Sequence, residues 1–174
     1  MSFEPGEAGG ARRLGFLRPE KYSHVERERR WLCDGLPDVG VTRSCEITDL
    51  YIADTRMRLR EMRFADGSVE RKLTKKAELS PDRRVITTIY LSDAEYALLA
   101  GLSGSKLSKT RHYLDTSPEV CVDVFTDGLH IAEVEFANSI AAQSYAALPW
   151  MGREVTNNPD CSGHRLAEKL GEIF

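Results

Sequence analysis

The sequence lacks any apolar run long enough to cross a bilayer, which takes about 20 residues in a helix. Its first residues, MSFEPGEAGGARRLGFLRPE, also lack the continuous apolar stretch of a secretory signal. We therefore expect a cytoplasmic protein without a membrane partner.

Clustered soft metal ligands are missing as well. The four cysteines and four histidines are widely spaced, with no C-x-x-C and no H-x-x-x-H pair. This spacing argues against a disulfide framework or a zinc site and indicates reduced, structural thiols. Excess positive charge is absent too, because the formal net charge is −3. A duplex-binding domain is usually basic, so nucleic acid is disfavoured as a partner.

The composition nevertheless suits one folded domain. Of the 174 residues, 41% are hydrophobic and 29% are charged, which is typical of globular proteins. Residues 1–22 are rich in Gly, Glu, Arg and Pro without sustained periodicity, and we expect them to form a flexible leader. Residues 23–174 show no internal boundary and are predicted to form a single domain.

Most of this domain alternates in character as β-strands do, with turn signals such as Asp66-Gly67 and Asp127-Gly128 between the segments. The predicted strands are His24–Cys33, Cys45–Ile52, Thr55–Met62, Val69–Lys76, Arg84–Leu91, Lys106–Leu114, Glu119–Thr126 and His130–Phe136. Helices are predicted from Ser92 to about Leu102, from Asn138 or Ser139 to Ala147, and from Ser162 to about Ile173. The fold class expected is α+β, mainly antiparallel β: an eight-stranded barrel or tunnel with helices packed outside.

Several predicted strands carry charges on alternate residues, which share one face of a strand. These rows are Glu26, Glu28 and Arg30; Arg56, Arg58 and Arg60; Lys72, Thr74 and Lys76; Lys109 and Arg111; and Glu133 and Glu135, with Asp123 between two valines.

These rows have two readings. They could form the solvated face of a half-buried sheet. However, arginine-rich rows repel unless anions neutralise them, and helices outside would turn the charged faces into the barrel. Buried charge is costly unless paired, and a polyphosphate with divalent cations would satisfy both signs: Arg and Lys bind phosphate oxygens, and carboxylates hold Mg²⁺ or Mn²⁺.

The rows also form a series of motifs in order along the chain. They are Glu26-Arg27-Glu28-Arg29-Arg30, Arg58-Leu59-Arg60, Leu73-Thr74-Lys75-Lys76, Lys109-Thr110-Arg111-His112, Val122-Asp123-Val124-Phe125, Ala132-Glu133-Val134-Glu135 and Pro149-Trp150-Met151-Gly152-Arg153-Glu154-Val155-Thr156. This series resembles the CYTH domain, the triphosphate tunnel metalloenzyme family, although Arg30 stands where that family's E-x-E-x-K motif ends in lysine.

The resemblance implies a β-tunnel that binds a small anionic, triphosphate-containing substrate with Mg²⁺ or Mn²⁺. The implied metal ligands are Glu26, Glu28, Asp123, Glu133 and Glu135, and the implied catalytic residues are Glu26, Glu28, Lys76, Glu133 and Glu135. The implied phosphate-binding residues are Arg30, Arg58, Arg60, Lys72, Lys76, Arg84, Lys109 and Arg111. Lys76 is preferred to Lys75 because it would lie on the same face of the strand as Lys72 and Thr74.

One departure bears on the chemistry. Many members of the family carry R-x-E-x-E on the fifth strand, and here Arg84, Ile86 and Thr88 occupy these positions, so a carboxylate pair is missing. The leading prediction is metal-dependent hydrolysis of a phosphoanhydride in inorganic triphosphate or a related compound. Two alternatives stay open: an adenylate cyclase-like lyase, and a polyphosphate- or nucleotide-binding module without turnover. A homodimer is one candidate oligomeric state.

Overall fold

A computed structural model describes residues 22–80 and 83–171. The predicted leader, residues 1–22, lies outside this part except for Tyr22. The strands are β1 (His24–Glu26), β2 (Glu28–Cys33), β3 (Val41–Ile52), β4 (Met57–Phe64), β5 (Val69–Ser80), β6 (Arg83–Tyr90), β7 (Gly104–Leu114), β8 (Val120–Phe125) and β9 (His130–Glu135). The helices are α1 (Asp93–Leu99), α2 (Ser139–Ser144), α3 (Gly163–Leu170) and the short 3-10 helix η1 (Pro159–Cys161).

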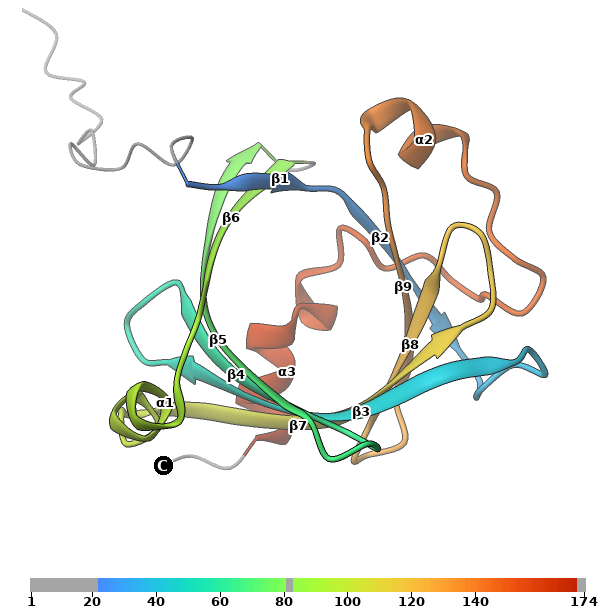
Figure 1. The fold of residues 1–174 in the computed structure, drawn as a ribbon. Coiled ribbons are helices and arrows are strands. Elements are labelled where there is room, and N and C mark those ends of the chain that lie inside the picture. The colour runs from blue at the N-terminus through green and yellow to red at the C-terminus, as the bar shows by residue number, and fades with distance from the viewer. Residues whose placement is uncertain (1–21, 81–82, 172–174) are drawn as a thin grey trace, which may run out of the picture.

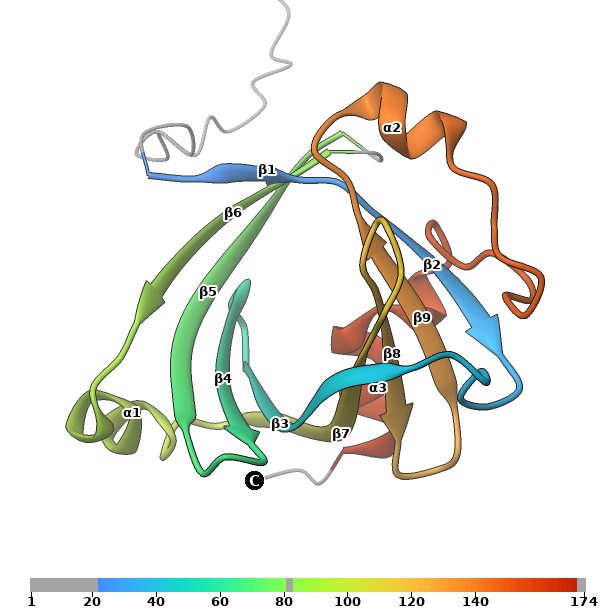
Figure 2. The ribbon, with the colours of Figure 1, turned by 45° about the vertical axis from the view of Figure 1, so that its right-hand side comes forward.

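The strands form one antiparallel sheet in the order β1-β6-β5-β4-β3-β7-β8-β9-β2, curled into a barrel (Figure 1). The predicted strand His24–Cys33 is split at Arg27: β1 pairs with β6, whereas β2 pairs with β9 at the other edge of the sheet. The continuous chain through Arg27 therefore closes the barrel, which explains why there are nine strands instead of the eight expected. The mainly antiparallel barrel is confirmed (Figure 2).

Predicted turn and cap signals also hold. Gly67 and Gly128 have φ of 85° and 86°, in the left-handed region that glycine adopts without strain. Ser92 caps α1, with its side chain accepting a hydrogen bond from the Glu95 amide while the Glu95 carboxylate bonds back to Ser92. The helices are shorter than predicted: α1 ends at Leu99 and α2 at Ser144.

Apolar side chains cover the outer face of the barrel at two places. Trp31, Val122 and Val134 are 2% exposed or less and pack beneath Tyr145, the residue that follows α2. On the opposite wall, residues of α1, including Tyr96 and Leu99, pack against buried residues of β3 and β4. These two helices lie outside the sheet, as expected.

Helix α3 differs, because it packs against side chains that point into the barrel. Its Leu166 and Ala167 contact Leu107, Phe125 and Ile131, which lie two residues from the charged Lys109, Asp123 and Glu133 and so share their inner face. Figure 1 shows α3 within the outline of the barrel opening. The helix therefore closes part of one end of the lumen instead of lying outside. No helix in residues 22–80 and 83–171 is long and apolar enough to cross a membrane.

Candidate active site

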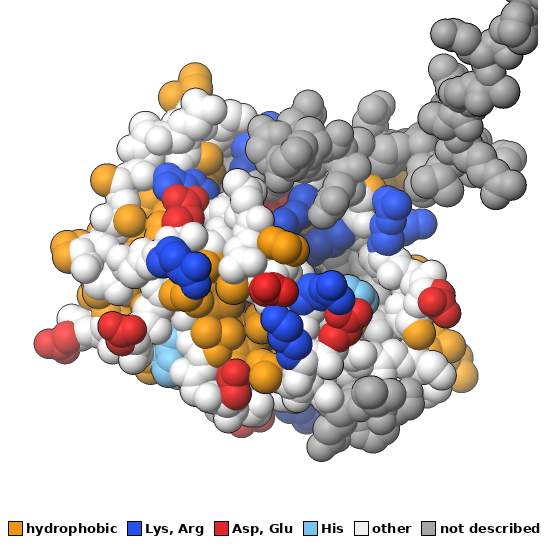
Figure 3. Space-filling view, turned by 180° about the vertical axis from the view of Figure 1, so that it is seen from behind, with side chains coloured by type: hydrophobic (Ala, Val, Ile, Leu, Met, Phe, Trp, Pro, Cys, Tyr) orange, Lys and Arg blue, Asp and Glu red, His pale blue; other side chains and the backbone are white. Residues whose placement is uncertain are grey.

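The lumen holds a cavity of about 1000 Å³. Every predicted site residue lines it except Lys72, which is paired with Glu70 at 2.7 Å, and Asp123, which is fully buried beneath the lining. The charged rows thus face inward, and basic side chains outnumber acidic ones in the lining. Figure 3 shows Lys and Arg side chains, with acidic ones among them, gathered around a recess on one face.

Asp123 organises the wall formed by β7 and β8. It lies directly opposite Arg111 in the strand register. Arg111 donates to both of its oxygens, each at 2.7 Å, and Lys109 donates to one of them. Burial opposes ionisation, yet Arg111 and Lys109 hold the pKa of Asp123 well below its usual range. Arg111 also pairs with Glu133. Both oxygens of Asp123 therefore serve to orient two cations.

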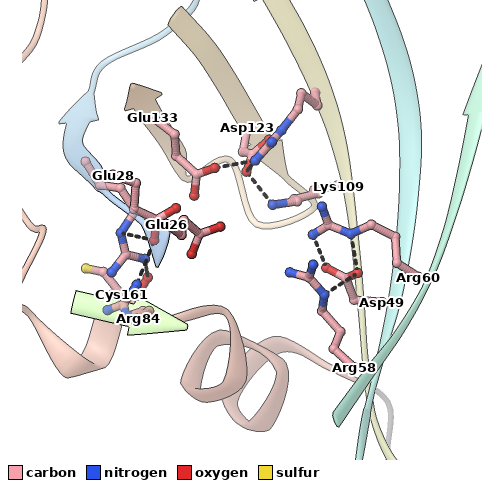
Figure 4. A network of polar contacts seen from close by, with 12 residues as sticks. Glu26, Glu28, Asp49, Arg58, Arg60, Arg84, Lys109, Asp123, Glu133 and Cys161 are labelled. Atoms are coloured by element: carbon pink, nitrogen blue, oxygen red, sulfur yellow. Dashed lines mark hydrogen bonds and ion pairs between the residues drawn. The ribbon is translucent and has the colours of Figure 1, made fainter. Parts of the chain in front are cut away.

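Asp49 does the same on the adjoining wall formed by β3 and β4, since β3 pairs with β7. This residue of β3 is 0% exposed and lies opposite Arg60 of β4. Arg60 donates to both carboxylate oxygens at 2.6 and 2.8 Å, and the Nε of Arg58 lies 3.5 Å from one of them. Figure 4 shows this group facing Glu26 and Glu28 across the lumen.

An acidic cluster lies on β1, β2 and β9. Glu28 and Glu135 are direct cross-strand neighbours on β2 and β9, and Glu26 precedes them on β1. Burial and the nearby charges of Glu26 and Glu28 raise the pKa of Glu135. Glu26 accepts from Lys76 at 2.9 Å and Glu28 from Arg84 at 2.7 Å. Opposed like charges destabilise a sheet, and Lys76 and Arg84 offset part of this repulsion.

The donor chemistry of this cluster fits Mg²⁺ or Mn²⁺, which prefer carboxylate oxygens. The described side chains nevertheless do not form a ready-made group of three or more His, Cys, Asp or Glu ligands. The carboxylates of Glu26 and Glu28 are turned toward Lys76 and Arg84 instead. Holding an ion would require them to exchange these partners for the metal.

Two arginines carry buried N–H groups without a hydrogen-bond acceptor among the described residues: the Nε atoms of Arg30 and Arg58. The Arg30 guanidinium is 5% exposed and is anchored by the backbone oxygens of Cys161, at 2.8 Å, and Thr156, at 3.2 Å. Unsatisfied buried donors are destabilising, and both arginines line the cavity. An anion in the lumen could supply the missing acceptors.

Sequence reasoning missed Asp49, Tyr51 and Gly163. Tyr51 shares the inner face with Asp49, and burial raises its pKa to about 12. A Cβ on Gly163 would lie 2.0 Å from the Tyr51 hydroxyl, so only glycine lets α3 approach this ring. The period-two signal was present in Asp49 and Tyr51, which alternate with Leu50 and Ile52. The contact with Gly163 had no local signal.

The departure from the R-x-E-x-E motif lies on β6, which pairs with β5. Ile86 is buried, and the Thr88 hydroxyl lies 3.1 Å from that of Thr74. An apolar group and a hydroxyl pair therefore stand at the positions where many members of the resembled family carry carboxylates.

No family model and no curated protein matches this sequence. Several solved structures do resemble the fold, and two of them are structures of NE1496. One, described as the hypothetical protein NE1496, has 25% identity and a TM-score of 0.57, and the match covers 86% of this chain and 99% of that one. The other, described as the inorganic triphosphatase NE1496, has 25% identity and a TM-score of 0.56, covering 82% of this chain and 93% of that one.

The fold of this chain is thus similar to that of NE1496, and its ordered motifs resemble those of the triphosphate tunnel domain of the CYTH type. The likeness extends over nearly the whole of NE1496, and the charged residues of the ordered motifs face one lumen in this chain.

Proposed function

We propose that this tunnel domain is a metal-dependent phosphohydrolase that cleaves the phosphoanhydride of inorganic triphosphate or a related triphosphate. The supporting observation is the lumen, where basic rows from several strands converge opposite a cluster of carboxylates. The likeness to a protein described as an inorganic triphosphatase supports the same reaction class.

The basic residues would bind the phosphates. Arg58, Arg60, Lys109 and Arg111 belong to two walls and are held in place by the buried Asp49 and Asp123. Guanidinium groups bind phosphate oxygens bidentately and stay charged even in a buried site. Because their positions are set before substrate arrives, they can offset negative charge on the reacting phosphates without reorganising.

Glu26, Glu28 and Glu135, with Glu133 beside them, would hold Mg²⁺ or Mn²⁺. When bound, such an ion polarises phosphate oxygens and lowers the pKa of a bound water. Lys76 and Arg84 would then be released from Glu26 and Glu28 and become free to bind phosphate. This exchange of partners would make substrate and metal binding mutually favourable.

A phosphate-release screen tests the proposal. The purified chain is incubated with inorganic triphosphate, thiamine triphosphate, ATP and longer polyphosphates, with Mg²⁺ and Mn²⁺ in turn. We expect orthophosphate release from at least one triphosphate and none without metal. Cyclic AMP from ATP would identify the lyase alternative, and absence of any product would refute both enzymatic functions.

The binding module remains a second candidate because Ile86 and Thr88 replace the expected carboxylate pair. A site with fewer carboxylates can keep its anion-binding arginines while losing turnover. Calorimetry showing tight triphosphate binding, together with no product in the screen, would establish this alternative. The cytoplasmic location and the homodimer stay predictions.

A further inference from the structure

Asp49 is buried in the wall of the lumen, yet it belongs to none of the seven sequence motifs that resemble the tunnel family. It is 0% exposed, and its carboxylate lies behind the guanidiniums that line the cavity. A buried carboxylate is tolerated only when cations and hydrogen-bond donors surround it. Its partners therefore indicate what it does.

Those partners are the two arginines of one strand. Arg60 donates hydrogen bonds to both carboxylate oxygens of Asp49, at 2.6 and 2.8 Å, in the bidentate geometry that fixes the plane of a guanidinium. Arg58 approaches through its Nε at 3.5 Å. The Nε of Arg60 is thereby occupied, whereas the buried Nε of Arg58 lacks a hydrogen-bond acceptor among the described residues.

Arg58 and Arg60 are two residues apart on the inner face of β4, so their positive charges repel each other. The negative charge of Asp49 offsets this repulsion. The positive charge of Lys109 on β7 adds to the attraction that keeps the Asp49 carboxylate ionised. Although burial opposes ionisation, these cations hold the pKa of Asp49 well below its usual range. Ionisation of the carboxylate is therefore favoured despite its burial.

We propose that Asp49 is a positioning residue, which holds the guanidiniums of Arg58 and Arg60 in the orientation that receives the phosphates of the substrate. It touches no substrate itself, because the arginines lie between it and the cavity. This inference rests on the proposed function, since it assigns how two phosphate-binding residues are preorganised for the reaction. Misplacement of such groups by about 1 Å can lower a rate by about 100-fold.

A simpler role, as a counter-charge alone, makes a different prediction. Asp49→Asn removes one negative charge and makes the lumen more positive. If Asp49 only offset charge, the variant would bind a triphosphate more tightly and turn it over at least as fast. If Asp49 positions the arginines, kcat falls by about 100-fold, while KM for triphosphate stays level or decreases.

The matched control is Glu61→Gln. Glu61 adjoins Arg60 on β4, is also buried, and pairs with Arg71 at 2.9 Å on the outer face of the barrel. Both substitutions remove a buried, arginine-paired carboxylate from neighbouring positions. We expect both to lower the melting temperature, and only Asp49→Asn to lower kcat. An equal loss of kcat in Glu61→Gln would show that Asp49 acts through stability and would overturn the proposal.

A comparison of combined variants tests the partners. If Asp49 acts through the two arginines, then adding Asp49→Asn to a variant that carries both Arg58→Gln and Arg60→Gln slows it no further. Multiplicative losses would contradict this. Should Asp49→Asn fail to fold, Asp49→Glu keeps the charge while moving the carboxylate by one methylene. It is expected to reduce kcat by about 10-fold, on the same dependence of rate on placement, and an unchanged kcat would overturn the proposal.

A readout independent of turnover separates this inference from the proposed function. The arginine Nε–H signals in nitrogen-edited NMR spectra report whether the guanidiniums are ordered. We expect the Arg60 signal, identified by its loss in Arg60→Lys, to shift and broaden in Asp49→Asn but not in Glu61→Gln. An unchanged Arg60 signal refutes the positioning role even if the wild-type protein proves to be a binder without turnover.

Discussion

Replacing Glu135 by Gln should stabilise the metal-free protein while removing its activity. Glu135 lies directly opposite Glu28, with Glu26 close by, and burial together with these charges raises its pKa. At neutral pH the ionised side chain therefore works against folding. Its retention makes sense if a cation binds there, as expected of functional sites that trade stability for activity.

The size of the stability gain follows from the geometry. A like-charged cross-strand pair differs from a neutral one by about 0.2–1 kcal/mol. The lumen walls partly desolvate the Glu135 carboxyl, but its side chain is still exposed to solvent in the cavity. Screening therefore favours the lower half of this range, and we take about 0.5 kcal/mol. For a domain of this size that corresponds to a melting temperature higher by about 1–2 °C. Turnover should fall by about 100- to 1000-fold, as for loss of one electrostatic contact to a transition state.

Thermal unfolding in EDTA measures the first effect, and phosphate release with Mg²⁺ or Mn²⁺ the second. A carboxyl whose pKa is raised by folding stabilises the protein when protonated and loses that contribution as pH rises through its folded pKa. The gain from Glu135→Gln should therefore be present at neutral pH and vanish in acid, where Glu135 is protonated. Glu154→Gln is the control, because Glu154 pairs with Arg29 at 2.7 Å and its loss should destabilise. A metal-free Glu135→Gln protein that melts lower than wild type, or one with full activity, would refute the reasoning.

Three further predictions follow from the site and the core. Arg58→Ala should lower turnover by at least about 100-fold while circular dichroism shows an intact fold; near-wild-type turnover contradicts the assignment. As the pH falls below about 4, the melting temperature should decrease, because folding depresses the pKa values of Asp49 and Asp123 and their contribution to stability is lost as they protonate. The check is that the melting temperature of Asp49→Asn decreases less steeply over the same pH range. Trp31→Ala should lower the free energy of unfolding, measured in urea, by about 3–5 kcal/mol, since Trp31 is 2% exposed in the core outside the barrel. A decrease below about 1 kcal/mol, in the range of surface substitutions, would show that this core does not stabilise the barrel wall.

The strands and the shared face of their charges could be predicted because both are local consequences of a period of two. Arg58 and Arg60 alternate with Met57 and Leu59, and Glu133 and Glu135 flank Val134, so one face of each of these strands is charged whichever strand lies beside it. The turns at Gly67 and Gly128 are equally local, since the left-handed backbone there favours glycine.

The pairing of strands with one another could not be predicted from the alternation of residues along each strand. Asp123 was predicted as a metal ligand, and the structure places both of its oxygens on Arg111 with Lys109 alongside. Its role depends on which strand lies next to β8 and in which register. Asp49 was missed for the same reason, because its partners on β4 become visible only once β3 and β4 are aligned.

The amino-acid sequence by itself thus determined the fold class, the rows of charged residues and the kinds of ligand that those rows suit. It could do so because backbone geometry sets the direction of each side chain along a strand. Tertiary structure alone decided which charges meet. It split the first strand at Arg27 to close the barrel, brought Gly163 of α3 against Tyr51, and placed Glu28 opposite Glu135. Such contacts join residues far apart in the sequence, and their energies depend on distances of a few ångströms that no local pattern records.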